Sequence, residues 1–287
     1  MAKLVSAGLH KVLYSFVGSD GYMSGGTSFD NPSNGDTVSF AELEGIRDID
    51  YSRPESPRTN ILANDGVLTQ FIFKPTENGS GTATVGVFDA SLASLAIGQS
   101  NVTSGHMVGT IANPDTLAFK NMWLMLASQA KDWDAGSVGN AGYSITWLYC
   151  QLSPRGRNGY NHQGDAQFQY DLVAQTFDTL PWGQTLSSAS SGAITKGESF
   201  DGIFTNNIPS VTRFVGNGSG TSVTLPNTAV SPSATTSTAF KTVSGTASAL
   251  TYAGSPSAGE YGISGTTVTL GDTLANGDNA FIVSEHA

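Results

Sequence analysis

Residues 40–51 alternate carboxylates and apolar side chains with a period of two. Acidic residues take the even positions and apolar residues the odd ones, namely Glu42, Glu44, Asp48 and Asp50 against Ala41, Leu43, Ile49 and Tyr51. Because successive side chains of a strand point to opposite faces, this pattern predicts an extended strand with one acidic and one apolar face. A helix remains an alternative, since apolar residues also recur at every third position, but Gly45 and the β-branched isoleucines disfavour it.

The acidic face has no evident role in stabilising the strand. Like charges on one strand face repel one another. Solvation of an exposed face is the simplest interpretation of these carboxylates. A surface that must prevent polyanions from adhering would benefit from the same charges.

The composition favours short strands joined by many turns. Only 13% of the 287 residues are charged, while Gly, Ser, Thr and Asn are abundant. The net charge of -10 argues against a protein that grips nucleic-acid phosphates, which requires clustered Lys and Arg. No apolar run approaches the roughly 20 residues of a membrane span, and the N-terminus lacks a signal-peptide core. We therefore expect a mainly β protein that is assembled in a cytosol and does not enter membranes.

The hydrophobic pattern places further elements along the chain. Extended segments are predicted at residues 38–51, 67–74, 82–88, 141–152 and 167–177. Residues 89–97 form the best helix candidate, because Asp89 can cap its start and Gly98 can end it. Residues 119–131 are too apolar for a surface element and predict either a central strand or a buried helix.

Two segments are predicted to be long loops that carry arginines. Pro54 and Pro57 prevent regular pairing, so residues 52–59 are expected to protrude. Residues 153–164 are rich in glycine and lack an apolar period, which also predicts a loop. Arg155 and Arg157 could contact phosphate, but in so acidic a chain an acidic edge of a protein partner is the more plausible contact. Arg53 and Arg58 lie in and beside the first loop.

The chain is predicted to contain two domains. Residues 1–212 include a glycine-rich arm over 1–35, and residues 213–287 are poor in charge and rich in Ser and Thr. We interpret residues 213–287 as a small all-β domain of immunoglobulin-like or similar type, joined by a flexible linker at residues 216–220. A separable domain of this kind predicts that deletion of residues 215–287 leaves assembly intact.

Groups for catalysis or metal binding are sparse. None of the histidines lies beside a nucleophile motif, and no Cys or His spacing suggests zinc. Cys150 lies in an apolar run and is expected to be a buried, inert thiol. Asp48 with Asp50, and Asp132 with Asp134, are weak signals that solvation explains. The sequence therefore predicts no enzyme activity, no cofactor and no metal.

The order of these features resembles the major tail tube proteins of long-tailed, siphovirus-like bacteriophages. The acidic strand at 39–50 is followed by a proline-rich loop and by Asn-Asp-Gly-Val-Leu-Thr-Gln-Phe at 64–71. A short helix at 89–97 comes next, and then strands that end in Phe-Asp-Thr-Leu-Pro-Trp-Gly-Gln-Thr at 177–185. The resemblance covers about residues 1–210, and a small C-terminal β domain often follows in that family.

The resemblance implies a fold and an assembly. It implies a β-sandwich flanked by one short helix, whose long hairpins form a continuous inner barrel when copies close into a hexameric ring. Rings would stack into the tail tube of a virion, assembled in the bacterial host cytoplasm. The DNA would then pass through the lumen without specific binding. Tape-measure, terminator and distal tail proteins would be further partners, and the C-terminal domain would decorate the outside.

In such a tube the residues noted above acquire roles. The carboxylates Glu42, Glu44, Asp48 and Asp50 would face the lumen, and the four arginines would lie on loops between subunits or rings. Another β-rich virion protein, such as a capsid decoration or fibre protein, is the nearest alternative. A carbohydrate-binding β-sandwich module that uses exposed Trp and Tyr is a second alternative, and a β-sandwich hydrolase is the least favoured.

Overall fold

The protein was analysed as a computed structural model. The structure describes residues 4–52, 58–63, 66–72, 78–87, 89–99, 102–104, 107–109, 117–132, 140–158, 167–189, 194–204 and 207–286. Strands dominate it, which confirms the mainly β fold class.

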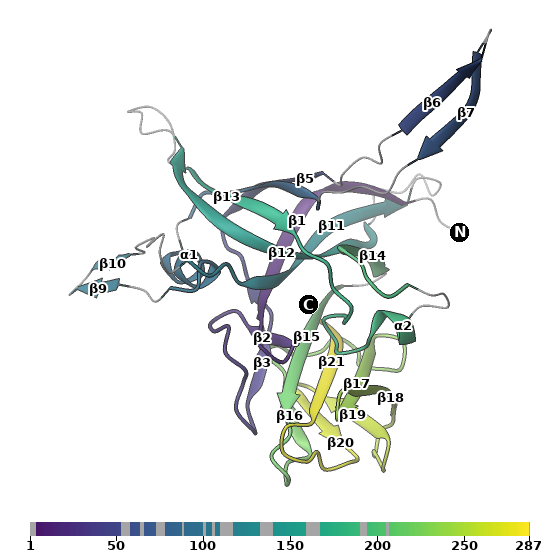
Figure 1. Ribbon diagram of the computed structural model, residues 1–287. Coiled ribbons are helices and arrows are strands. Elements are labelled where there is room, and N and C mark those ends of the chain that lie inside the picture. The colour runs from purple at the N-terminus through teal and green to yellow at the C-terminus, as the bar shows by residue number, and fades with distance from the viewer. Residues whose placement is uncertain are drawn as a thin grey trace.

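An antiparallel sheet from the N-terminal part curves almost into a barrel (Figure 1). In pairing order its strands are β2 (Met23–Gly25), β1 (Leu4–Val17), β11 (Asn121–Asp132), β12 (Asn140–Asn158), β13 (Gln167–Ala174), β8 (Ser80–Val85) and β5 (Ile46–Ser52). In addition, β4 (Ala41–Glu42) pairs with β1, and β14 (Ser199–Phe204) pairs with β12. Its interior is filled by a barrel core that includes Val12, Phe16, Leu124, Leu148 and Leu172.

The helix that the sequence predicts at residues 89–97 is present, and it covers part of the barrel core. The helix α1 (Ala90–Ala96) begins where the Asp89 carboxylate accepts hydrogen bonds from the backbone N–H groups of Ser91 and Leu92. Leu92 and Ala96 are buried in the barrel core. Gly98 follows with a φ of 68°, a conformation that favours glycine at a helix end. A second, single-turn helix is α2 (Leu186–Ala189).

The C-terminal unit is built on one eight-stranded sheet. In pairing order its strands are β16 (Ser222–Thr224), β20 (Thr267–Leu270), β19 (Glu260–Ser264), β18 (Thr246–Tyr252), β17 (Ser237–Val243), β21 (Asn279–His286), β15 (Ile208–Val215) and β3 (Thr37–Ser39). The pairing between β18 and β19 is short and parallel, and the others are antiparallel. The unit has its own C-terminal core, which includes Phe214, Val268 and Ile282.

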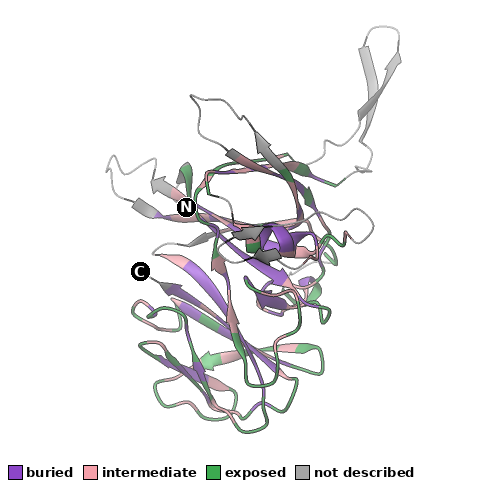
Figure 2. Cartoon of the chain, turned by 90° about the vertical axis from the view of Figure 1, so that its left-hand side faces the viewer, coloured by how far each residue is buried: buried purple, intermediate pink, exposed green. Residues whose placement is uncertain are grey.

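A third core joins the barrel to the C-terminal unit. This interface core combines Trp123, Trp147 and Met125 of the barrel sheet with Val211 and Phe281 of the C-terminal unit. Figure 2 shows the buried residues running through the barrel and on into the C-terminal strands. Because β11 is covered on both faces, its sequence is apolar without a period, which explains why periodicity alone left strand and helix open at 119–131.

The predicted linker at residues 216–220 is wrong, and the predicted domain boundary cuts through a strand. The boundary between residues 212 and 213 falls inside β15, and β15 pairs with β3 from the N-terminal part of the chain. Residues 216–220 form no linker between units, because Gly216 N–H donates to the Asp278 carbonyl at 2.7 Å and Gly218 N–H donates to the Leu274 carbonyl at 2.9 Å. The glycines there serve a tight turn within the C-terminal unit.

Two other segments differ from the predicted elements. Residues 38–51 are not one strand, because a turn at Glu44 and Gly45 separates β4 from β5. Residues 153–158, predicted as loop, extend β12 and pair with β13, with a register shift between Pro154 and Gly156. Short hairpins complete the described chain: β6 (Arg58–Ala63) pairs with β7 (Gly66–Ile72), and β9 (Val102–Ser104) pairs with β10 (Met107–Gly109).

Burial of tyrosines predicts a loss of stability at alkaline pH. Burial, assisted by the nearby Asp89 carboxylate, raises the pKa of Tyr14 from 10.0 to about 12. A raised pKa in the folded state gives a stabilisation that is complete below pH 10 and is lost as the pH rises through 12. We therefore expect the urea midpoint to fall over this range, and Tyr14→Phe to reduce the fall. A midpoint that stays constant over the same range would contradict the prediction.

Candidate functional site

The acidic segment closes the sheet into a barrel. Its first part, β4, pairs with β1, and Leu43 N–H donates to the Val12 carbonyl at 2.9 Å. Its second part, β5, pairs with β8, and the Gly45 carbonyl accepts from Gly86 N–H at 2.7 Å. Gly45 has a φ of 67°, which glycine adopts readily at the turn between the two parts. The segment therefore bridges the two sides of the curved sheet.

Barrel closure explains the alternation in this segment. Leu43 is buried in the barrel core, and Ile46, Ile49 and Tyr51 pack against it. Asp48 and Asp50 point the other way and are exposed. The predicted strand is thus confirmed over β5, and the apolar face exists because it lines the barrel interior.

Outward-facing polar side chains form a continuous surface across β5, β8, β13 and β12. Cross-strand pairing places Asp50 opposite Thr82, Thr82 opposite Asp171, and Asp171 opposite Ser153. A parallel row places Asp48 opposite Thr84, and Thr84 opposite Gln169. We call these residues the polar wall: Asp48, Asp50, Thr82, Thr84, Ser153, Gln169 and Asp171. Hydroxyl, amide and carboxylate groups make this a hydrated surface of predominantly acidic character.

Two arginines accompany the polar wall. The Arg155 guanidinium Nε lies 2.8 Å from Asp171 Oδ1, and this exposed ion pair offsets the charge of Asp171. Asp48 and Asp50 contribute two further negative charges to the wall. Arg47 lies at the bulge of β5, and a Cβ on Gly86 would meet its side chain, so Gly86 leaves space for it. The wall therefore retains a small excess of negative charge.

The structure separates the four carboxylates that the sequence grouped together. Asp48 and Asp50 share the polar wall. Glu42 instead forms an ion pair with Lys11, at 2.7 Å, beside a cavity at the junction with the C-terminal unit. Glu44 is exposed in the turn between β4 and β5. The alternation of acidic and apolar residues therefore describes the two faces of β5 only. The turn at Gly45 places Glu42 on a separate strand, β4, away from the polar wall.

The arginines predicted on loops occupy different elements. Arg155 lies on β12, and so does Arg157, which is paired in the backbone ladder with Phe168; the loop assignment for both is wrong. Arg58 lies on β6 and pairs with Ile72. Arg53 lies outside the described residues. Strand pairing with β13 overrides the glycine and proline content of residues 153–158.

Sequence reasoning missed Asp171, Thr82 and Thr84 as members of the surface. Each alternates with a buried neighbour such as Ala83 or Tyr170, so a period of two was available as a signal. The alternation does not reveal that β8 lies between β5 and β13. Only the sheet order brings these residues next to Asp50.

The cysteine and two of the tryptophans lie in apolar cores of the described chain. Within the described ranges, no group of three or more His, Cys, Asp and Glu side chains is placed to hold a metal ion. Cys150 is buried in the barrel core, and burial raises the pKa of its thiol, as expected of an inert cysteine. Trp123 and Trp147 are buried in the interface core, and Trp182 packs against Trp147, so these rings are packing residues. Over the same ranges, no helix has the length and apolarity that crossing a membrane requires.

Comparisons with known proteins leave the family open. Neither the models of known protein families nor the curated proteins include a match to this sequence.

Proposed function

We propose that this chain is a self-assembling structural subunit of a bacteriophage tail tube, whose stacked rings conduct DNA. The polar wall would line the lumen, and neighbouring copies would meet through the β6–β7 hairpin. Tape-measure, terminator and distal tail proteins would contact the assembled tube. In this role the chain needs shape and surface chemistry, and no reaction centre.

The observation that carries the proposal is the position of the hairpin relative to the wall. The hairpin β6–β7 lies in the chain between β5 and β8, which are neighbouring strands of the polar wall. The hairpin extends away from the barrel in Figure 1. Its two strands pair with each other. A two-stranded ribbon alone is marginally stable in water. A neighbouring copy that packs against it would supply the missing cover.

Ring closure would turn the wall into a channel lining. A contact between different surfaces of identical subunits closes into a ring or continues as a filament, according to its rotation. If the hairpin reaches the next copy, the surface of β5 and β8 is continued from subunit to subunit. Repetition of Asp48 and Asp50 around the ring would give a negative potential that repels DNA phosphates. DNA would then pass without adsorbing.

Assembly of the purified chain tests the proposal. We expect negative-stain microscopy and light scattering to show rings or tubes of constant width. Replacing residues 58–72 with a short Gly-Ser linker is expected to give monomers with an unchanged thermal midpoint, because the hairpin pairs with itself. The control carries the same linker inserted at the Ser244–Gly245 turn of the C-terminal unit. A wild-type chain that remains monomeric at high concentration, or fibres in place of rings, would contradict the tube.

The lumen assignment makes a separate prediction about DNA. Asp48→Lys combined with Asp50→Lys is expected to leave assembly intact and to make assembled particles retain short duplex DNA, in a salt-dependent manner. Glu42→Lys combined with Glu44→Lys changes the charge equally at two exposed positions outside the wall, and this control is expected to retain less DNA. Retention that is equal for both variants would place the wall on the outer surface of the assembly.

A further inference from the structure

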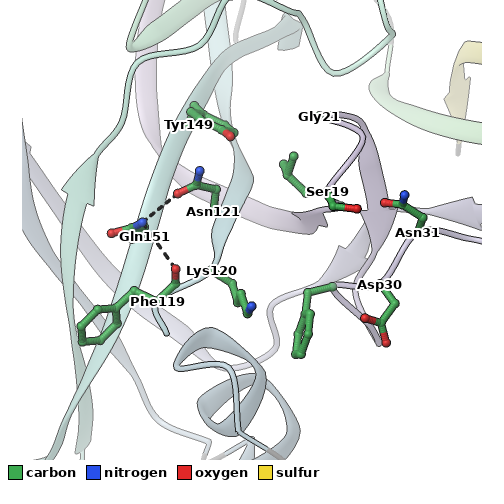
Figure 3. A pocket seen from close by; sticks show the side chains of 12 residues that line it. Ser19, Gly21, Asp30, Asn31, Phe119, Lys120, Asn121, Tyr149 and Gln151 are labelled. Carbon is green, nitrogen blue, oxygen red and sulfur yellow. Dashed lines mark hydrogen bonds between the residues drawn. The ribbon is translucent and has the colours of Figure 1, made fainter. Parts of the chain in front are cut away.

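A groove next to the C-terminal unit has the composition of a ligand site and lies apart from the β5 and β8 part of the polar wall. It has a volume of about 500 Å³ between β11 and β12 on one side and the segments at residues 17–21 and 29–31 on the other. Figure 3 shows Asn121, Tyr149 and Gln151 on one wall, facing Ser19 and Asn31 on the other. A smaller cavity of about 200 Å³ shares Gly21 and Tyr149, so the groove continues past Tyr149.

The amide side chains of the groove are held in defined orientations. Gln151 Nε2 donates to Asn121 Oδ1 at 2.8 Å and to the Phe119 carbonyl at 3.5 Å (Figure 3). These bonds use the Gln151 nitrogen and leave its Oε1 as an acceptor. The Tyr149 side chain lies next to Asn121 in the groove (Figure 3). The groove therefore presents oriented donors and acceptors close to one another.

The opposite wall is held in place by a buried charge. Arg213 of β15 is 2% exposed, donates from Nη1 to the Met23 carbonyl at 2.8 Å and pairs through Nη2 with Asp20. Asp20 N–H in turn donates to Asn31 Oδ1 at 3.3 Å. Burying a charge is unfavourable unless it is paired and hydrogen-bonded, and one established use of such groups is to specify a geometry. The loop that forms this wall is thus organised before any ligand arrives.

An aromatic ring and balanced charges complete the groove. Phe119 lies at the edge of the groove and is 42% exposed, and its ring is directed away from Ser19 and Asn31 (Figure 3). The Lys120 ammonium lies 4.3 Å from the centroid of the Phe29 ring, and Asp30 also lines the groove. A strongly charged ligand of either sign would be repelled by one of these two side chains, Lys120 or Asp30. A neutral ligand fits the groove better.

We propose that this groove binds a neutral oligosaccharide. Sugar hydroxyls donate and accept hydrogen bonds at once, which matches side-chain amides and a tyrosine hydroxyl. At the edge of the groove, the apolar C–H face of a terminal pyranose would cover the exposed Phe119 ring, which buries apolar surface on both sides. The continuation of the groove past Tyr149 suits a chain of sugars better than a single unit. This inference does not depend on the proposed tube.

Ligand binding is tested on the full chain with defined sugars. The probes are chitotriose, cellotriose and maltotriose, with a heparin tetrasaccharide and an uncharged peptide as competitors, measured by saturation-transfer NMR and calorimetry. At least one neutral trisaccharide is expected to bind, and Phe119→Ala and Gln151→Leu are expected to weaken its binding about tenfold or more. Phe200→Ala is the matched control, because this ring is 36% exposed and lies outside the groove.

Three outcomes would overturn the inference. They are failure of every neutral trisaccharide to bind at millimolar concentration, preference for heparin or the peptide, and unchanged binding by Phe119→Ala at an unchanged thermal midpoint. Assembly of the same samples is scored separately by microscopy, so failure of the sugar site and failure of the tube proposal are distinguishable.

Discussion

Removing residues 208–287 is expected to abolish cooperative folding of the remaining chain. Trp147 and Trp123 are 0% and 1% exposed, and the deletion would remove Val211 and Phe281 from the core that covers them. Exposing large aromatic and aliphatic side chains opposes folding by about 1.5–3 kcal/mol for each. We expect the truncated chain to aggregate or to lack a thermal transition, as measured by calorimetry and near-UV circular dichroism. This reverses the expectation of a separable C-terminal domain.

A point substitution in the same core distinguishes packing from general damage by truncation. Phe281→Ala in the full chain is expected to lower the free energy of unfolding by about 3–5 kcal/mol, as is usual for a buried aromatic side chain. Val243→Ala, on a side chain that is 41% exposed, is the control and is expected to have little effect. A truncated chain that unfolds cooperatively near the wild-type midpoint would show that the C-terminal unit is only docked onto the barrel.

Replacing Arg213 with Met is expected to be the most destabilising change of a single charged residue. Arg213 Nε donates to Asn279 Oδ1 at 2.8 Å, in addition to its contacts with Met23 and Asp20, and it lies over the Tyr22 ring. Removing the Arg213 guanidinium leaves the Asn279 side-chain oxygen, the Met23 carbonyl and the Asp20 carboxylate without their donor. We expect the free energy of unfolding to fall by about 3 kcal/mol, the lower end of the range for a buried ion pair. The lower end applies because the Asp20 side chain is 27% exposed.

A double-mutant cycle measures the coupling between Arg213 and Asp20. Arg213→Met, Asp20→Asn and the combined variant are compared by urea denaturation, and the two losses are expected not to add. The control pair is Lys241 and Asp272, which are joined at 2.8 Å and have side chains that are 25% and 24% exposed. Breaking that pair is expected to change stability by about 1 kcal/mol or less. Additive losses at Arg213 and Asp20 would contradict a coupled buried network.

Local patterns predicted several elements well. The alternation around Ile49 and Asp50 predicted both the strand and its two faces, and Asp89 with Gly98 marked the ends of α1. These features depend on side-chain direction and capping, which neighbouring residues decide. The prediction failed at residues 153–158, because pairing with β13 provided backbone partners that the glycine content did not indicate.

The sites depended on contacts that no local pattern contains. Asp171 joins Asp50 on the polar wall only because β8 lies between their strands, and Glu42 leaves that surface because β4 pairs with β1. The groove requires Arg213 to reach a loop far away in the chain, near Asp20. Strand order, unlike strand periodicity, is selected by how the whole chain buries its apolar faces.

The sequence by itself determined that this protein is mainly β and acidic, and it predicted a strand with one polar face over residues 38–51, which the structure confirms over 46–52. These properties follow from composition and from the period of two. The tertiary structure decided that this strand closes a barrel, that only Asp48 and Asp50 of the four carboxylates share the polar wall, and that the C-terminal unit shares a core with the barrel. Backbone hydrogen bonds are alike at every residue, so packing of side chains distant in sequence chose among the possible pairings.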